Sequence, residues 1–389
     1  MERSHDIVLL GATGFTGSLT AAELALRAPE GLRLALAGRN RDKLARVVER
    51  LAPKAPRLAD AELLHADVTD PGSLRELAES TRVLVTTVGP YALHGEPVVA
   101  ACAAAGTDYV DLTGEPEFID RMYLAHHRKA VQTGARLVHA CGFDSIPHDL
   151  GAQFTVEQLP EGVPLHVRGY VRAGGLISGG TWASALTGFS RARQTIASHR
   201  ARRAAEPQPE GRRIRLEARP HRALGWWAVP LPTIDPMVIG RSAAALDRYG
   251  PDFTYGHYAG AKRLPVAVGG VLGVTGAFVA AQVGPVRRFL LSRWPQGKGP
   301  SEQQMDRGWF KVTFVGEGGG RRVVCEVLGG DPGYRETSRM LAESALCLAV
   351  DELPETAGQV TTAAAMGAKL RERLQRSGIE FRVVESSGA

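Results

Sequence analysis

The first constraint is a glycine-rich turn close to the start of the chain. Residues 7–10 form an apolar run that is long enough for one buried strand and too short for a helix. Gly11, Gly14 and Gly17 follow at regular spacing, and the next segment, 18–27, has helical composition. This order lets the backbone approach a pyrophosphate, which the free N–H groups of the helix N-terminus can bind. The sequence therefore predicts a dinucleotide-binding unit here.

Apolar and helical segments alternate over the rest of the first 150 residues. Strands are expected at 7–10, 32–37, 61–64, 83–88, 109–111 and 137–140, and further helices at 44–51, 96–105 and 116–133. Strands that alternate with helices form a parallel sheet with helices on both faces. The sequence therefore predicts an α/β protein whose N-terminal domain, 1–150, is a Rossmann-type doubly wound parallel sheet.

The second half of the chain has a different pattern. Alternating apolar residues at 307–315 and 321–328 predict two antiparallel strands around a glycine-rich turn. Further elements are expected as strands at 165–171 and 379–384 and as helices at 337–353 and 363–376. We predict an α+β domain with a mixed sheet over 151–365, which binds the substrate or forms a dimer. Residues 366–389 are expected to form a helix and a strand that pack back on the first domain.

The end of the second strand favours NADP(H) as the cofactor. In NAD-binding proteins an acidic residue at this position binds a ribose hydroxyl. Here the strand ends in Arg39, with Asn40 and Lys43 close by. A guanidinium suits a 2′-phosphate, which a carboxylate would repel. The alternative is that Arg39 is a solvated residue at a strand end.

Two later turns complete the expected cofactor site. Asp67 and Val68 follow the third strand, where a turn often borders the adenine, although Asp67 could equally cap the next helix. The segment 88–90 closes the fourth strand, where the crevice of an open α/β sheet is expected. The predicted cofactor-binding residues are Gly11, Thr13, Gly14, Phe15, Thr16, Gly17, Arg39, Asn40, Lys43, Asp67, Val68, Val88, Gly89 and Pro90.

Cysteine usage and charge restrict the remaining functions. The four cysteines are scattered without C-x-x-C spacing, so we expect no metal site, no disulfide framework and a reducing compartment. No basic-then-apolar leader precedes the first strand, which predicts a cytoplasmic location. The formal charge of +6 and the isoelectric point near 9.3 favour acidic partners such as nucleotide phosphates, anionic lipid or an acidic carrier protein. No nucleic-acid-binding motif is present, so no nucleic-acid partner is expected.

Several motifs stand in an order that resembles the saccharopine dehydrogenase-like oxidoreductases. They are Gly11–Gly17, Ala37–Arg39, Val88–Tyr91, Gly95–Val99, Tyr109–Glu115, Cys141–Pro147, Ser178–Thr181 and Gly329–Tyr334. The similarity covers nearly the whole chain, and it is strongest to the bacterial branch called trans-acting enoyl reductases.

This resemblance implies a function and its partners. It implies NADPH-dependent reduction of an enoyl double bond on a lipid or polyketide-type substrate, presented by an acyl carrier or polyketide synthase partner. Two alternatives stay open: a saccharopine-type amino-acid or imine dehydrogenase, and a non-catalytic NADP-binding scaffold at a membrane. Related proteins share a fold more often than they share a substrate.

A hydride-transferring enzyme also needs a proton source, and four residues at the carboxyl ends of strands are candidates. Asp144 and Ser145 follow the sixth strand at the hinge between the domains, so we expect them to face the substrate. Asp-Ser before Ile-Pro also resembles a helix cap. Tyr91 and Glu115 follow the fourth and fifth strands, and Tyr91 is expected to pack near the nicotinamide.

Two further segments suggest contacts outside the active site. Residues 191–222 contain ten arginines and three glutamates, which fits either a solvated helix pair or a docking face for anionic lipid or a carrier protein. Residues 264–286 are uncharged and have basic residues on both sides. Their glycines and prolines argue against a spanning helix. A peripheral contact with the inner face of the cell membrane, or a buried core or dimer helix, fits better.

Overall fold

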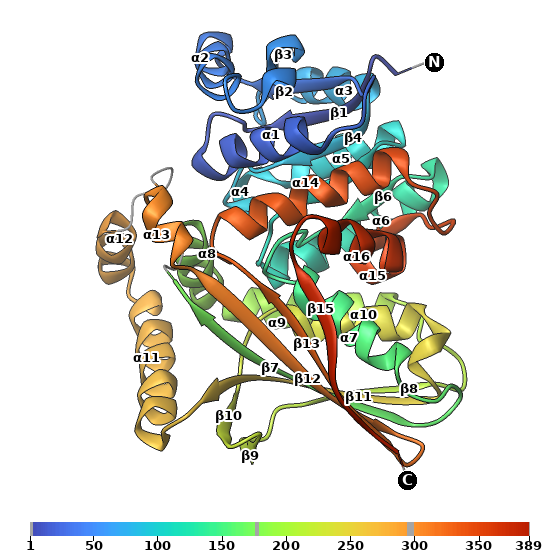
Figure 1. The fold of residues 1–389 in the computed structure, drawn as a ribbon. Helices are drawn as coiled ribbons and strands as arrows, with labels where there is room; N and C mark the ends of the chain where they lie inside the picture. The colour runs from blue at the N-terminus through green and yellow to red at the C-terminus, as the bar shows by residue number, and fades with distance from the viewer. Residues whose placement is uncertain (1–2, 176–178, 294–298, 389) are drawn as a thin grey trace.

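Two β-sheets, with helices between and around them, make up the molecule (Figure 1). The computed structural model describes residues 3–175, 179–293 and 299–388. The first sheet has seven strands and the second has eight. The N-terminus lies beside the first sheet and the C-terminus at the far end of the second.

The first sheet is parallel throughout, which confirms the predicted Rossmann-type domain. In spatial order its strands are β14 (Gly358–Val360), β6 (Arg136–Val138), β5 (Asp108–Asp111), β4 (Thr81–Thr86), β1 (His5–Leu10), β2 (Leu34–Gly38) and β3 (Glu62–His65). Strand β1 sends Ile7 and Leu9 into one core and Val8 and Leu10 into the other. Because successive side chains of a strand point to opposite faces, an unbroken apolar run makes a strand that is buried on both faces.

Helices cover both faces of this sheet. The helices that contribute to the core of Ile7 and Leu9 are α1 (Phe15–Arg27), α2 (Arg41–Leu51) and α14 (Arg335–Val350). The helices that contribute to the other core are α3 (Pro71–Ser80), α5 (Glu96–Ala105) and α6 (Pro116–Thr133). Shorter turns are α4 (Tyr91–His94), α13 (Glu302–Asp306) and the 3-10 segments η1 (Pro56–Asp60) and η2 (Asp247–Tyr249).

The C-terminal part of the chain returns to the first sheet earlier than the predicted boundary at residue 366. Helix α14 packs against α1, and β14 pairs with β6 as the seventh strand. Helix α14 replaces the helix expected at 337–353, and most of its side chains are buried. Helices α15 (Thr362–Ala365) and α16 (Gly367–Arg376) follow, and α16 contacts α14. The final strand instead joins the second sheet.

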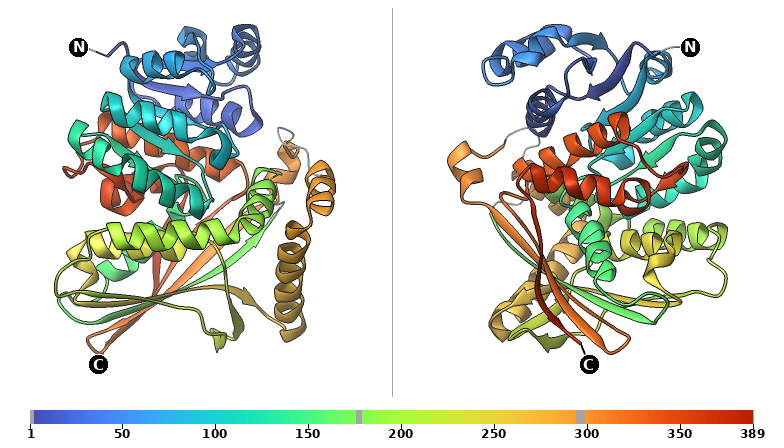
Figure 2. Two further views of the ribbon diagram at one scale, coloured as in Figure 1. Left: turned by 180° about the vertical axis from the view of Figure 1, so that it is seen from behind. Right: turned by 45° about the vertical axis from the view of Figure 1, so that its right-hand side comes forward.

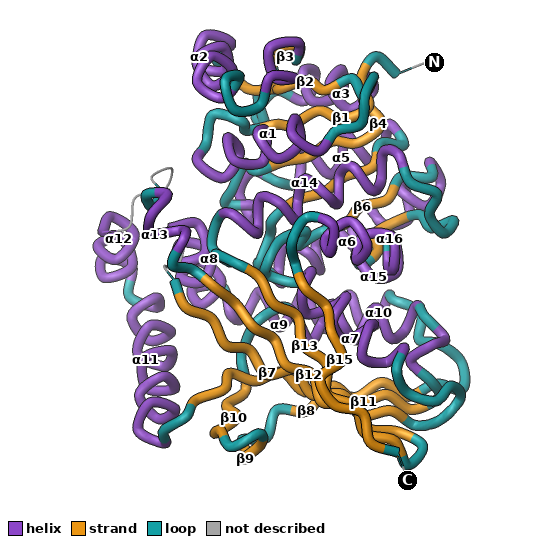
Figure 3. Tube along the Cα trace, viewed as in Figure 1, coloured by secondary structure: helices purple, strands orange, loops and turns teal. Residues whose placement is uncertain are grey.

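The second sheet is mixed, as predicted for an α+β domain (Figure 3). Its order is β15 (Glu380–Ser387), β13 (Arg321–Gly329), β12 (Trp309–Gly318), β7 (Leu165–Gly174), β11 (Asp252–Ala261), β10 (Trp226–Pro230) and β9 (His221–Ala223), with β8 (Arg213–Glu217) paired to β11. Helices α7 (Ile146–Glu157) and α10 (Asp235–Ala245) pack on it from the side of the first domain. They form the layer between the two sheets.

The arginine-rich segment joins the two halves of the molecule. Its first part is α9 (Ala192–Ala205), which packs along α6, and its second part forms β8 and β9, so the expected helix pair does not form. The buried Arg202 pairs with Asp120 of α6, and Arg191 pairs with Glu117 at Nε–Oε2 2.5 Å. These two arginines therefore hold α9 on the first domain.

One apolar helix lies at the side of the molecule and contacts α8 (Gly179–Ser190), β10 and β11. The views in Figures 1 and 2 show α11 (Leu264–Gln282) beside the second sheet, with α12 (Gly284–Arg293) following it. Helix α11 contacts α8 where Gln282 Nε2 donates to the Phe189 carbonyl at 2.7 Å. Its side chains are otherwise mostly exposed, so it is not a core helix of this chain.

Candidate cofactor and active site

The glycine turn between β1 and α1 has the geometry that a nucleotide phosphate requires. Gly11 has a φ of +98°, which favours glycine, and its N–H donates to the Ala37 carbonyl at 3.1 Å. A Cβ at Gly17 would lie 2.2 Å from the Gly11 carbonyl oxygen, so only glycine lets the helix start this close to the strand. These two glycines keep the turn tight beneath the helix N-terminus.

The N-terminus of α1 has no side-chain cap among the described residues. Gly14 is its N-cap residue and supplies no side-chain cap, so the N–H groups of Phe15 and Thr16 in the first turn have no side-chain acceptor at the cap. Such groups bind a pyrophosphate well. The second half of the chain lies next to this turn, because the rings of Phe15 and Tyr334 are 5.0 Å apart. Thr13, in the turn itself, is exposed.

The residues predicted around the adenine and its ribose divide into two groups. Arg39 and Lys43 are exposed at the end of β2, where a 2′-phosphate would lie. Asn40 instead caps α2, since its Oδ1 accepts from the Lys43 N–H at 2.9 Å. Asp67 accepts from the N–H and the hydroxyl of Thr69, and the N–H bond is the main reason why its pKa is lowered. Asn40 and Asp67 therefore have structural roles, and Val68 beside them is half-buried.

The loop after β4 borders the same edge of the sheet. The strand ends at Thr86, two residues before the predicted end, and the Val88 N–H donates to the Thr86 hydroxyl at 3.2 Å. Gly89 and Pro90 follow, joined by a cis peptide bond. This loop lies against the glycine turn, because a Cβ at Gly11 would meet Val88 at 2.9 Å.

Two of the predicted catalytic residues are structural. The buried Tyr91 hydroxyl donates to the Thr86 carbonyl at 3.1 Å and accepts from the Leu112 N–H at 3.2 Å. Burial raises its pKa well above its ordinary value, which makes the hydroxyl a poor acid. The Glu115 carboxylate accepts from the N–H groups of Tyr91 and Ala92, at 3.1 and 2.8 Å, and so caps α4. We therefore withdraw Tyr91 and Glu115 as proton donors.

A buried carboxylate organises the ends of β5 and β6. Asp111 accepts from the Tyr109 hydroxyl at 2.9 Å and lies 2.7 Å from His139 Nδ1. Its other oxygen accepts from the N–H groups of Thr113 and Ala140, both at 3.0 Å. This network fixes the loops that carry the next candidate.

Asp144 is the candidate that keeps the properties of an acid. It is half-buried beside Gly114, where an added Cβ would lie 3.4 Å from Oδ1, and no described residue donates a hydrogen bond to its carboxyl group. Burial, and then the negative charge of Asp111, raise the pKa of Asp144 to about 6. Ser145 is buried next to it, and its Oγ has no hydrogen-bond partner among the described residues. Shifts of this kind are typical of functional carboxyl groups.

The structure therefore brings part of the predicted site together. The glycine turn, the loop after β4 and the Asp144–Ser145 turn all follow strands of the first sheet at its carboxyl edge. Ser178, in one of the resembling motifs, lies outside the described residues.

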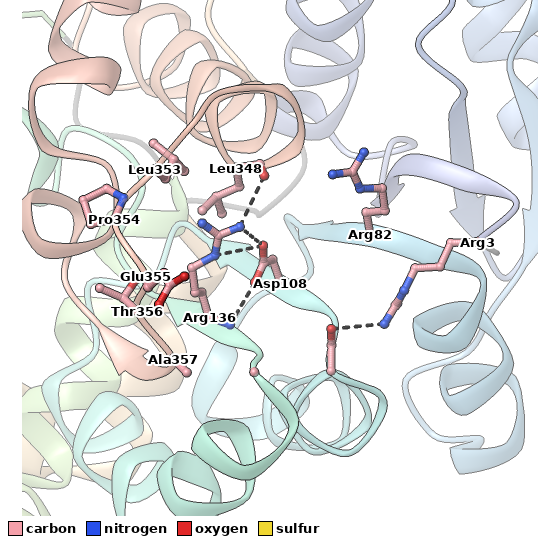
Figure 4. A pocket seen from close by; sticks show the side chains of 12 residues that line it. Arg3, Arg82, Asp108, Arg136, Leu348, Leu353, Pro354, Glu355, Thr356 and Ala357 are labelled. Atoms are coloured by element: carbon pink, nitrogen blue, oxygen red, sulfur yellow. Dashed lines mark hydrogen bonds and ion pairs between the residues drawn. The ribbon is translucent and has the colours of Figure 1, made fainter. Parts of the chain in front are cut away.

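A separate cavity of about 590 Å³ opens at the opposite edge of the sheet (Figure 4). Arg3, Arg82 and Arg136 line it, at the amino ends of the strands, and Arg136 Nε donates to Asp108 at 3.0 Å. Parallel sheets bind their ligands at the carboxyl ends of the strands. This cavity is therefore not the cofactor site.

Known proteins resemble this chain over its full length. A putative trans-acting enoyl reductase from Mycobacterium tuberculosis is 38% identical, with 97% of each chain covered. The chain belongs to the saccharopine dehydrogenase-like oxidoreductases. A member of this family from Bos taurus, named saccharopine dehydrogenase-like oxidoreductase, is 32% identical, with 99% of each chain covered.

The family model and a solved structure agree with the observed architecture. The model for the saccharopine dehydrogenase NADP binding domain matches residues 7–138, which contain the glycine turn and Arg39. NADP(H) is thus the cofactor that this family domain implies. The saccharopine dehydrogenase (L-Glu forming) from Saccharomyces cerevisiae has the same fold, with a TM-score of 0.53 at 13% identity, covering 98% of this chain and 100% of that one.

Proposed function

We propose that this oxidoreductase uses NADPH to reduce an enoyl double bond of a lipid or polyketide-type substrate, carried as a thioester. The observation that supports this best is Asp144, a half-buried carboxyl with a pKa of about 6 at the carboxyl edge of the sheet. Relatives named trans-acting enoyl reductases support the reaction class.

The residues of the site have separate tasks in this proposal. The first turn of α1 binds the pyrophosphate, and Arg39 with Lys43 binds the 2′-phosphate. NADPH supplies a hydride equivalent when bound. Asp144 donates the proton to the α-carbon, since an acid whose pKa lies near the working pH transfers protons efficiently. The Asp111 network keeps the turn of Asp144 in place.

The proposal also includes a peripheral membrane contact through α11. Val266, Leu272 and Val279 expose 63%, 66% and 59% of their surface, and exposed apolar residues occupy most of the circumference of the helix. The apolar surface of such a helix is removed from water only when lipid or another protein covers it. Lys262 and Arg263 precede it and Arg287 and Arg288 follow, which favours an anionic lipid surface. A lipid-like substrate would be available there.

The test of the reaction is NADPH oxidation followed by stopped-flow absorbance with a panel of enoyl thioesters and imines. Consumption of NADPH by an enoyl thioester, and its loss in Asp144→Asn, is the expected result. Consumption only with an imine or an amino-acid substrate would indicate the saccharopine-type alternative. Tight NADPH binding without turnover on any acceptor would indicate the scaffold.

The test of the membrane contact is flotation with vesicles of phosphatidylcholine, with or without phosphatidylglycerol. We expect flotation only with the anionic lipid, and loss of it in Leu272→Asp. A matched control is Leu124→Asp, which changes an exposed leucine on α6. Equal flotation of Leu272→Asp and the unchanged protein would contradict the contact.

A further inference from the structure

A buried cluster below the Asp144 turn has the composition of a metal site. His148 belongs to α7, Asp235 is the first residue of α10 and His257 lies on β11. Helices α7 and α10 lie between the two sheets and contact each other, and α10 also contacts β11 of the second sheet (Figure 1). The side chains of His148, Asp235 and His257 are 3%, 3% and 1% exposed.

The spacing of the three groups does not fit ordinary hydrogen bonds. His148 Nε2 lies 3.7 Å from Asp235 Oδ1, and His257 Nε2 lies 3.4 Å from Asp235 Oδ2. N–H···O bonds measure about 2.7–3.2 Å. Asp235 Oδ1 and His257 Nε2 have no hydrogen-bond partner among the described residues. Buried polar atoms of this kind are rare, because they lose their bonds to water without replacement.

The same spacing fits ligands around one small cation. One ligand atom from each of the three residues lies within 4.8 Å of the others. Zinc bonds of about 2.0–2.1 Å in tetrahedral geometry place neighbouring ligand atoms about 3.3 Å apart. The observed distances of 3.4 and 3.7 Å, measured to the two different oxygens of Asp235, are close to this spacing.

The surroundings prepare the His257 imidazole for this role. The Tyr255 hydroxyl lies 2.9 Å from His257 Nδ1. A hydroxyl that accepts from Nδ1–H leaves the lone pair on Nε2, on the side of Asp235.

We propose that His148, Asp235 and His257 bind one zinc ion, with water as the fourth ligand, and that this ion fastens α7, α10 and β11 together. The absence of clustered cysteines led us to expect no metal, but a His₂Asp site needs none. Asp144 lies four residues before His148 on the chain. The ion would thus lie near the proposed proton donor and support the turn that carries it.

The first experiment measures metal content in protein that has no histidine tag. The protein is stripped with a chelator, dialysed against buffered zinc and analysed by mass spectrometry of the metal. One zinc per chain, a rise in melting temperature on addition of zinc, and the visible absorption of four-coordinate cobalt after exchange are expected. Protein that keeps no zinc and gives no cobalt spectrum would overturn the proposal.

Variants then locate the ion. Asp235→Asn and His257→Gln preserve side-chain size and are expected to weaken zinc binding at least about tenfold and to abolish the zinc-dependent melting shift. His65→Gln, which changes an exposed histidine at the end of β3, is the matched control and should bind zinc as the unchanged protein does. NADPH binding shows that each variant is folded, and His148→Gln replaces any variant that is not. Zinc binding that is unchanged in the folded cluster variants would refute the site.

Discussion

Replacement of Asp144 by asparagine should raise the stability of the protein at high pH and lower its activity. The pKa of this carboxyl rises from 3.8 to about 6 in the folded protein, mainly through burial. The folded state therefore binds the proton more tightly than the unfolded state does. The stabilisation from this proton is complete below about pH 4 and is lost as the pH rises to about 6. A shift of two pKa units corresponds to about 3 kcal/mol in the free energy of unfolding. At neutral and higher pH this carboxyl therefore leaves the folded protein less stable by this amount than it does at low pH.

Asp144→Asn removes that ionisation and keeps the shape of the side chain. At about pH 8 the variant should be more stable than the unchanged protein by up to about 3 kcal/mol, and at about pH 4 the two should be equal. Urea unfolding over this pH range measures the difference. Enoyl reduction should meanwhile fall about 10²–10⁴-fold, because a general acid is lost.

Asp60→Asn changes an exposed carboxylate in the first domain and should not show this pH-dependent gain. If Asp144→Asn gives no gain in stability that grows with pH, the carboxyl is not held in an unfavourable ionised state. If activity is unchanged, Asp144 is not the proton donor.

Three further changes test the cofactor site and the contact between the domains. Arg39→Ala should raise the Kd of NADPH about 10–100-fold in a fluorescence titration and leave the Kd of NADH unchanged. An equal rise in both Kd values would show that Arg39 does not bind the 2′-phosphate. Gly17→Ala should abolish NADPH binding in calorimetry, because its Cβ would lie 2.2 Å from the Gly11 carbonyl oxygen; normal binding would show that the turn can open. Asp120→Ala leaves the buried Arg202 with Glu206 as its remaining carboxylate partner and should reduce the free energy of unfolding by about 1–3 kcal/mol in urea; no measurable loss would contradict this.

Local patterns predicted the first sheet well. The apolar run 7–10 and the three glycines identify the strand and the turn because both depend on neighbouring residues. The helix that follows starts at Phe15 and not at Ser18, since Gly14 serves as its N-cap. The strand β14 could not be found in this way, because it has only three residues and forms by pairing with β6.

Candidate catalytic residues were harder to rank from sequence. Tyr91 and Glu115 follow strands, as a catalytic residue would, but their partners are backbone groups that a sequence does not reveal. The cluster of His148, Asp235 and His257 comes from three segments far apart in the chain. No spacing rule could have connected them before the fold was known.

The position of β14 has a consequence for how the protein is made. When the ribosome has synthesised the first 150 residues, all strands from β1 to β6 exist, but β6 has an unpaired edge. The apolar face that α14 covers is also open until residues 335–350 have been added. Exposed edges and apolar faces promote association between chains. The nascent N-terminal domain therefore needs protection, from a chaperone or from rapid completion of the chain, for as long as synthesis of the second domain takes.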